Sequence, residues 1–251
     1  MLAEENNEIG LEIGHVLFID IVGYSKLLIE EQKERLHRLT EIVLETPQVR
    51  EATDEQLVRL PTGDGMALVF RHSAAEPARC ALELAEALRK HPEILVRMGI
   101  HSGPVSEVRD VNGRTNLAGA GINLAQRVMD CGDAGHILLS HHVAEDLEEF
   151  ERRRPCLHDI GTFEVKHGVR VSVTNLYSDN VGNPRLPTKL QAVKKHRAHV
   201  RWVEIAAALL VLGAIGVAGF FFLRRPGQLG STAPDNSIAV LPFVDMSQAK
   251  D

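Results

Sequence analysis

The chain has 251 residues, a formal net charge of −6 and an isoelectric point near 6.1. This length accommodates one sizeable domain and a smaller appendage. The negative charge excludes nucleic acid as the main partner, because an acidic surface repels a polyanion. The three cysteines, at positions 80, 131 and 156, have neither disulfide-framework nor metal-ligand spacing, so we expect reduced thiols.

The chain begins with an acidic stretch and continues with alternating strand and helix signals. Residues 1–14 form an N-terminal extension; the stretch to Glu12 has four glutamates and no basic residue, which is untypical of a signal peptide. Hydrophobic patterning then predicts a strand at 15–20, a helix at 25–44, a hairpin at 57–70, a helix at 74–90 and a strand at 94–101. This β-α-β-β-α-β order indicates a ferredoxin-like α+β fold, a mostly antiparallel sheet covered by helices.

The second half of the predicted domain adds further elements in the same style. They are a hairpin arm at 105–116, an alanine-rich helix at 117–131, a strand at 137–140, a short helix to about 150, and strands around Phe163 and Val171. Together with the first half, they predict one domain over residues 15–178.

Two aspartates stand at the ends of predicted elements. Asp20 ends the first strand, and Asp64 lies on the Thr-Gly-Asp-Gly turn of the hairpin. Two carboxylates suit a pair of divalent ions, Mg²⁺ or Mn²⁺, because these hard cations prefer few oxygen ligands and keep positions for water and phosphate. The turn after Asp20, formed by Gly23, Tyr24 and Ser25, offers backbone N–H groups to phosphates.

The predicted helix at 117–131 supplies a second set of polar groups. Asn123 and Arg127 are four residues apart, so they share one face of that helix and reach the same ligand. An amide beside a planar guanidinium suits a sugar oxygen and a phosphoryl group that accumulates negative charge.

These segments, with Val96–Gly103 and Phe163–Gly168, resemble the catalytic domain of the class III nucleotidyl cyclases, of the membrane-tethered bacterial type. The resemblance implies a homodimer that closes a nucleoside triphosphate, ATP by preference, into a 3′,5′-cyclic nucleotide and pyrophosphate, in cyclic-nucleotide signalling. It also implies the roles of single residues: two metal ions on Asp20, Asp64 and the carbonyl of Ile21, a ribose contact from Asn123, transition-state stabilisation by Arg127, and contact of Lys166 with the outer phosphates.

The positions that read the base depart from the family pattern. Adenylate cyclases of this family commonly place a lysine four residues before the second metal aspartate and an aspartate seven residues before the ribose asparagine. Leu60 and Asn116 stand there in this chain, and neither fits the guanylate cyclase pattern of glutamate and cysteine. Leu60 makes no hydrogen bond, whereas Asn116 both donates and accepts. UTP, CTP and GTP therefore stay open beside ATP.

Two other functions compete with a cyclase. A catalytically silent cyclase-like module would bind nucleotide or only dimerise, and the presence of both aspartates, Asn123 and Arg127 argues against it. A diguanylate cyclase shares the sheet topology but carries a Gly-Gly-Asp/Glu-Glu-Phe hairpin, which residues 62–66 do not match.

The C-terminal part predicts a membrane anchor. A basic linker at 179–202 leads to a helix at 203–223, whose uncharged run from Ile205 to Leu223 is long enough to cross a hydrocarbon core of about 30 Å. More basic residues precede this helix than follow it, which predicts a single-pass protein of the inner or plasma membrane with a cytoplasmic catalytic domain. We expect residues 224–251 to form an extracytoplasmic linker and the start of a truncated further domain.

Overall fold

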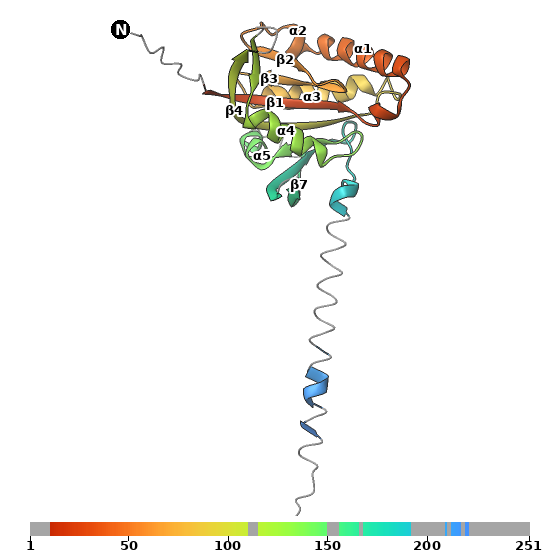
Figure 1. The fold of residues 1–251 in the computed structure, drawn as a ribbon, viewed down its shortest axis with the longest axis vertical. Helices are drawn as coiled ribbons and strands as arrows, with labels where there is room; N and C mark the ends of the chain where they lie inside the picture. The colour runs from red at the N-terminus through yellow and green to blue at the C-terminus, as the bar shows by residue number, and fades with distance from the viewer. Residues whose placement is uncertain are drawn as a thin grey trace, which may run out of the picture. The chain divides into compact units, whose positions relative to one another are not determined.

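A computed structural model of the chain describes residues 11–109, 115–149, 156–165, 168–191, 209, 212–216 and 219–220. The chain divides into two units, Met1–Ala198 and His199–Asp251. The first unit holds every strand described below (Figure 1).

An eight-stranded sheet forms the centre of the first unit, in the order β2-β3-β1-β4-β6-β8-β7, with β5 paired to β4. All described strand pairs are antiparallel except β4 with β6. The strands are β1 (Leu11–Ile21), β2 (Leu57–Pro61), β3 (Gly65–Phe70), β4 (Val96–Arg109), β5 (Thr115–Ala118), β6 (Ile137–Ser140), β7 (Leu157–Val165) and β8 (Val169–Leu176).

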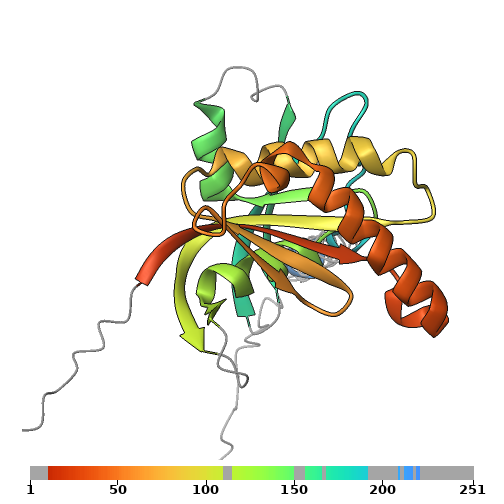
Figure 2. The same ribbon diagram turned by 90° about the horizontal axis from the view of Figure 1, so that it is seen from above.

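Helices cover both faces of the sheet, but unequally. The helices are α1 (Ile29–Glu45), α2 (Pro47–Arg50), α3 (Ala75–Leu88), α4 (Ala120–Asp130) and α5 (His141–Glu148), with a 3₁₀ turn, η1 (Tyr24–Lys26), before α1. The large hydrophobic core lies between one sheet face and α1, α3 and α5. Of the helices just named, α4 packs on the opposite face, as the view from above shows (Figure 2).

The alternation of side chains along β1 decides what faces α4. Leu17 and Ile19 belong to the large core, whereas Val16 and Phe18 pack with Ala125 of α4. Successive residues of a strand point to opposite faces, so Asp20 shares the face of Val16 and Phe18. The strand therefore delivers one carboxylate to the side of the sheet that carries α4.

Glycine at position 99 lets α4 lie close to β4. A Cβ atom there would stand 2.4 Å from the amide nitrogen of Met129 and 2.5 Å from the carbonyl oxygen of Ala125. Both are backbone atoms of a helix, which cannot turn aside as a flexible side chain can. The close approach of α4 to the sheet therefore requires a residue without a side chain at this position.

The segment after β8 packs back onto the domain. We call residues 183–191 the tail segment. Its Leu190 is only 3% exposed, and it lies in a cluster with Val128, Phe163 and Val171. Thr188 donates two hydrogen bonds to the carboxylate of Asp133, at 2.7 and 2.8 Å. This part of the expected linker is thus a fixed part of the first unit.

The predicted α+β class is confirmed, and the elements follow the predicted order. Several boundaries differ; β4, for example, runs to Arg109 rather than ending at residue 101. The first helix begins at Ile29 rather than at residue 25, because the 3₁₀ turn occupies Tyr24–Lys26. The first strand begins at Leu11 rather than at residue 15, because its N-terminal half pairs with the long β4, with Leu11 opposite Ser106.

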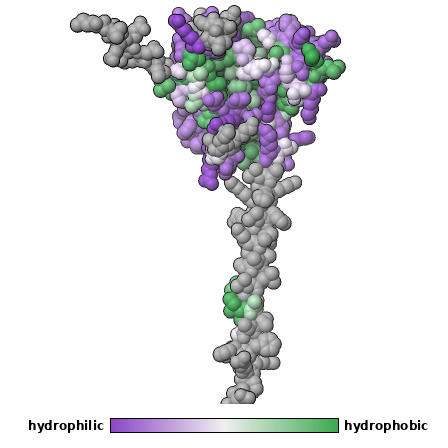
Figure 3. Space-filling model, in the orientation of Figure 1, coloured by the Kyte–Doolittle hydropathy of each residue, from purple (hydrophilic) through white to green (hydrophobic). Residues whose placement is uncertain are grey.

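The second unit is described only in short helical stretches, at 209, 212–216 and 219–220. The rest of the helix predicted at 203–223, and residues 224–251, lie outside the described residues. In the described part of the chain, no helix is both long and apolar enough to cross a bilayer. In Figure 3 the described stretches of the second unit are largely hydrophobic, whereas the visible face of the first unit is mostly hydrophilic.

We predict that Gly99→Ala destabilises the domain by about 3 kcal/mol, since the added methyl group meets helix backbone rather than a mobile side chain. Urea unfolding measures this change. Gln126→Ala on the exposed side of α4 is the matched control and should unfold like the wild type. Equal stability of Gly99→Ala and wild type would contradict the close packing of α4 on β4.

Candidate active site

The pairing of β1 with β3 brings the two predicted metal aspartates together. Asp20 stands opposite Gly65 in this register, so the turn that carries Asp64 folds over the end of β1. The amide of Ile21 donates a 3.0 Å hydrogen bond to the carbonyl oxygen of Asp64, which fixes the two backbones to each other. The carboxyl groups of Asp20 and Asp64 lie within hydrogen-bonding reach.

Asp20 is held in an environment that disfavours its charge. Its side chain is only 7% exposed. Burial raises the pKa of this carboxyl most and the neighbouring carboxyl of Asp64 adds to the rise, whereas Arg97 lowers the pKa in part; the net pKa is about 6. The site thus has one guanidinium against two carboxyl groups and attracts additional positive charge.

Arg97 is a site residue that the sequence analysis did not single out. It stands directly opposite Asp20 in the register of β1 and β4. Its Nε donates to Oδ2 of Asp20 at 2.8 Å, and its Nη2 lies 2.8 Å from the same oxygen. Nη2 also lies 3.2 Å from Oδ1 of Asp130, the last residue of α4. Only the strand register, which a sequence pattern leaves undetermined, could have revealed this neighbour.

The donor set at this edge of the sheet fits divalent ions of the Mg²⁺ type. Two adjacent carboxylates and a backbone carbonyl are hard oxygen donors, and their charge exceeds what Arg97 balances. No group of three His, Cys, Asp or Glu side chains that could hold a metal occurs among the described residues. Ions of this type commonly keep several coordination positions for water and phosphate when only a few protein oxygens bind them.

The turn after β1 opens toward solvent beside these carboxylates. Gly23 has φ of 76°, a left-handed conformation that favours glycine, and nothing lies within 4 Å of where its Cβ would stand. The backbone amide of Lys26 donates a 2.9 Å hydrogen bond to the carbonyl of Gly23, which closes the turn through Tyr24 and Ser25. The first N–H groups of such a turn have no partner within it, so they are available to a ligand.

Asn123 and Arg127 lie on the side of α4 away from its own sheet. The buried residues of α4 are Gly121, Ala125, Val128 and Met129, whereas Asn123 is exposed and Arg127 is half-buried. In the described part of the chain, no hydrogen bond or ion pair joins either side chain to Asp20 or Asp64. The structure therefore brings together the two aspartates, and it places the amide and guanidinium as a second group on an outward helix face.

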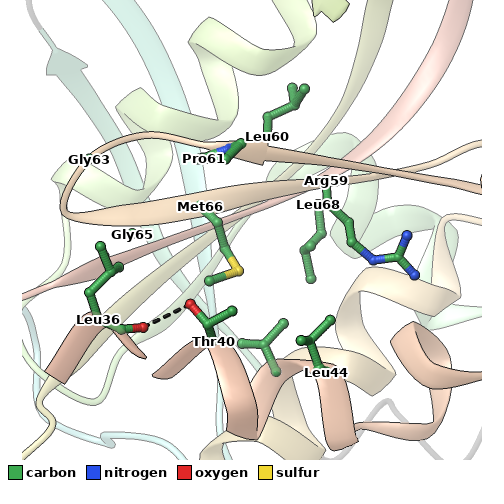
Figure 4. Close-up of a pocket in the computed structure, with 11 residues that line it drawn as sticks. Leu36, Thr40, Leu44, Arg59, Leu60, Pro61, Gly63, Gly65, Met66 and Leu68 are labelled. Carbon is green, nitrogen blue, oxygen red and sulfur yellow. Dashed lines mark hydrogen bonds between the residues drawn. The ribbon is translucent and has the colours of Figure 1, made fainter. Parts of the chain in front are cut away.

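The two candidate base-reading residues line different hollows. Leu60 contributes to a cavity of about 210 Å³ between α1 and the β2–β3 hairpin, but its side chain points away from Met66 and Thr40, toward the face of the sheet that carries α4 (Figure 4). Asn116 lines a separate hollow beside Val58, and its Oδ1 accepts a hydrogen bond from the amide of Leu117 at 2.8 Å. Lys166 lies outside the described residues.

Comparisons with known proteins agree with this fold. The profile of the adenylate and guanylate cyclase catalytic domain matches residues 12–174. Among solved structures, the guanylate cyclase domain of RhGC from Catenaria anguillulae, in complex with GTP, superposes with a TM-score of 0.55 at 20% identity, over 66% of this chain and 97% of that one. A search of curated protein sequences found no match.

Two further solved structures share the fold. The adenylyl cyclase CyaB from P. aeruginosa has a TM-score of 0.51 at 21% identity, covering 68% of this chain and 98% of that one. An adenylate/guanylate cyclase/hydrolase from Silicibacter pomeroyi has a TM-score of 0.52 at 24% identity, covering 67% and 98%. The profile match spans well over half of the chain and includes both aspartates, Asn123 and Arg127. The chain therefore belongs to the family of adenylate and guanylate cyclase catalytic domains.

Proposed function

We propose that this protein is a nucleotidyl cyclase that converts a nucleoside triphosphate, preferably ATP, into a 3′,5′-cyclic nucleotide and pyrophosphate. The observation that carries the proposal is the contact between Asp20 and Asp64 at the end of the central strand, with more negative charge than Arg97 balances. Such a pair of carboxylates suits phosphoryl transfer, in which positioning and charge stabilisation provide most of the rate enhancement.

In this mechanism the ribose 3′-hydroxyl attacks the α-phosphorus, loses its proton, and expels pyrophosphate as the ring closes. Two ions of Mg²⁺ or Mn²⁺, held by Asp20, Asp64 and the carbonyl of Ile21, would lower the pKa of that hydroxyl and neutralise the triphosphate. Asn123 hydrogen-bonds to the ribose and orients the attacking oxygen. Arg127 donates to the phosphoryl oxygens where charge develops.

The triphosphate lies along the turn that follows β1. The backbone N–H groups of Gly23, Tyr24 and Ser25 face it, and Lys166 contacts its outer phosphates. Open space beside Gly23 supports this placement, since a phosphate needs close access to the backbone there.

We propose a homodimer with two shared sites. The outward position of Asn123 and Arg127 on α4 supports this arrangement, because their own sheet lies behind the helix. Each site takes Asp20 and Asp64 from one protomer and the α4 pair from the other. A two-fold axis completes both sites at once, since each chain carries both halves.

The base is read by Asn116 more than by Leu60 in this proposal. Leu60 offers only apolar contact, whereas the Asn116 amide both donates and accepts. Its Oδ1 already accepts one hydrogen bond from a neighbouring backbone amide, which leaves one lone pair of that oxygen and the NH₂ group for a base. ATP is the preferred substrate, and UTP, CTP and GTP are the alternatives.

We also propose that the helix at 203–223 anchors the protein in the inner or plasma membrane, with the catalytic unit in the cytoplasm. The uncharged run and the excess of basic residues before it support this topology.

The reaction is tested by incubating the purified protein with each of the four ribonucleoside triphosphates and Mn²⁺, and resolving products by mass. We expect a cyclic product from the wild type. The Asp20→Ala and Asp64→Ala variants should each form that product at less than a few per cent of the wild-type rate. Asp179→Asn, an exposed carboxyl outside the site, is the control and should stay active. Absence of a cyclic product from all four triphosphates would instead support the silent module.

The raised pKa of Asp20 predicts a pH effect on the stability of the metal-free protein. Its pKa of about 6 lies above the 3.8 of an ordinary aspartate, so ionisation costs more in the folded state. The stabilising contribution is full below pH 4 and is lost as pH rises through 6. Between pH 5 and 7.5 in chelator, the free energy of unfolding of the wild type, measured in urea, should therefore fall by about 1 kcal/mol relative to that of Asp20→Asn. Parallel pH profiles of the two proteins would contradict the raised pKa.

The shared site predicts complementation between two inactive chains. Asp20→Ala and Arg127→Ala are each expected to be inactive alone. In a mixed dimer, one site receives both lesions and the other receives none. Random exchange makes half of the dimers mixed, so activity should return to about a quarter of the wild-type value. No recovery on mixing would show that each protomer holds a complete site of its own.

A further inference from the structure

The guanidinium of Arg97 contacts two carboxylates, those of Asp20 and Asp130. Arg97 binds Oδ2 of Asp20 through Nε and Nη2, at 2.8 Å each, and its Nη2 also lies 3.2 Å from Oδ1 of Asp130. The side chain of Arg97 is 22% exposed and that of Asp130 is 30% exposed, so solvent screens both pairs only in part. Asp130 ends α4, the helix whose outward face bears Asn123 and Arg127.

The tail segment holds Asp130 from its other side. Lys189 donates from Nζ to the backbone carbonyl of Asp130 at 2.5 Å, at the C-terminal end of α4 where a cation is favourable. The two bonds from Thr188 to Asp133 and the burial of Leu190 fix Lys189 in this place. A continuous set of contacts therefore runs from Lys189 through Asp130 and Arg97 to Asp20.

Metal binding at Asp20 conflicts with the contact that Arg97 already makes to this carboxylate. The proposed ions use the carboxylate of Asp20, whose Oδ2 already accepts a hydrogen bond from Nε of Arg97 and lies 2.8 Å from its Nη2. A guanidinium and a divalent cation a few ångströms apart repel each other, and both compete for the same oxygen. Arg97 has to give up this oxygen when a metal ion arrives, and Asp130 is the carboxylate that already contacts it.

We propose that Asp130 is a positioning residue that takes over Arg97 when metal ions occupy Asp20, and that the tail segment holds Asp130 in place for this exchange. The inference rests on the proposed function, because it requires metal at Asp20. It extends beyond the family match, which ends at residue 174 and leaves out Thr188 and Lys189. Without Asp130, Arg97 has one carboxylate left, stays on Asp20 and competes with the metal.

Direct measurement of Mn²⁺ binding to the full chain tests this exchange without turnover. The electron paramagnetic resonance signal of the free hydrated ion reports binding in the absence of nucleotide. We expect Asp130→Asn to raise the Mn²⁺ dissociation constant roughly fivefold, the size of one partly exposed ion pair. Asp179→Asn, which removes an exposed carboxyl in the same part of the chain, should bind like the wild type.

The Arg97→Met background separates this role from a merely structural one. With the competing guanidinium removed, Mn²⁺ should bind more tightly than in the wild type, and adding Asp130→Asn should change nothing further. A defect in the folding of α4 would weaken binding equally in both backgrounds. An unchanged dissociation constant in Asp130→Asn, or an equal loss in the Arg97→Met background, overturns the proposal.

Lys189 supplies a second arm of the test. Lys189→Met should raise the Mn²⁺ dissociation constant in the same direction as Asp130→Asn, and Lys189→Arg, which keeps a donor for the carbonyl, should restore it. Lys90→Met is the matched exposed control. Binding by the wild type that persists in Asp20→Ala would refute the metal site itself, an outcome distinct from failure of the exchange.

Discussion

The contact between two carboxyl groups at the end of the central strand is the constraint on which the rest of this structure depends. Asp20 and Asp64 meet because β1 and β3 pair in one register, and a shift by one residue would turn Asp20 to the other face of the sheet. Burial of Asp20 contributes most to raising its pKa to about 6, so the fold keeps a carboxyl where its charge is costly. Arg97 offsets part of that cost, and divalent ions would offset the remainder.

Much of this arrangement could be predicted from the sequence, because it depends on local patterns. The order of strands and helices follows from hydrophobic periodicity, and Asp20 and Asp64 stand where predicted elements end. Arg97 could not be predicted as a site residue, because its partner Asp20 is 77 residues away and is brought to it only by the pairing of β1 with β4. The contact of Lys189 with α4 was hidden for a similar reason, since a basic stretch after prolines is typical of a linker.

The helix α4 links two groups of site residues that the sequence pattern predicts as separate, the aspartates and the pair of Asn123 and Arg127. Gly99 allows its buried side to approach the sheet, while Asn123 and Arg127 occupy its outer side. Its last residue, Asp130, contacts Arg97 and through it Asp20. The base-reading positions show the opposite case: the family pattern pairs Leu60 with Asn116, yet within this chain they line separate hollows.

The packing of the tail segment also determines where the folding unit ends. Leu190 covers Val128, Phe163 and Val171, and His136 is tied to the carbonyl of Arg185 at 2.6 Å. A fragment cut at the edge of the family match would uncover this apolar surface and remove the Lys189 contact from the end of α4. Such a fragment would self-associate through the exposed patch, whereas one that extends past Gln191 keeps it covered.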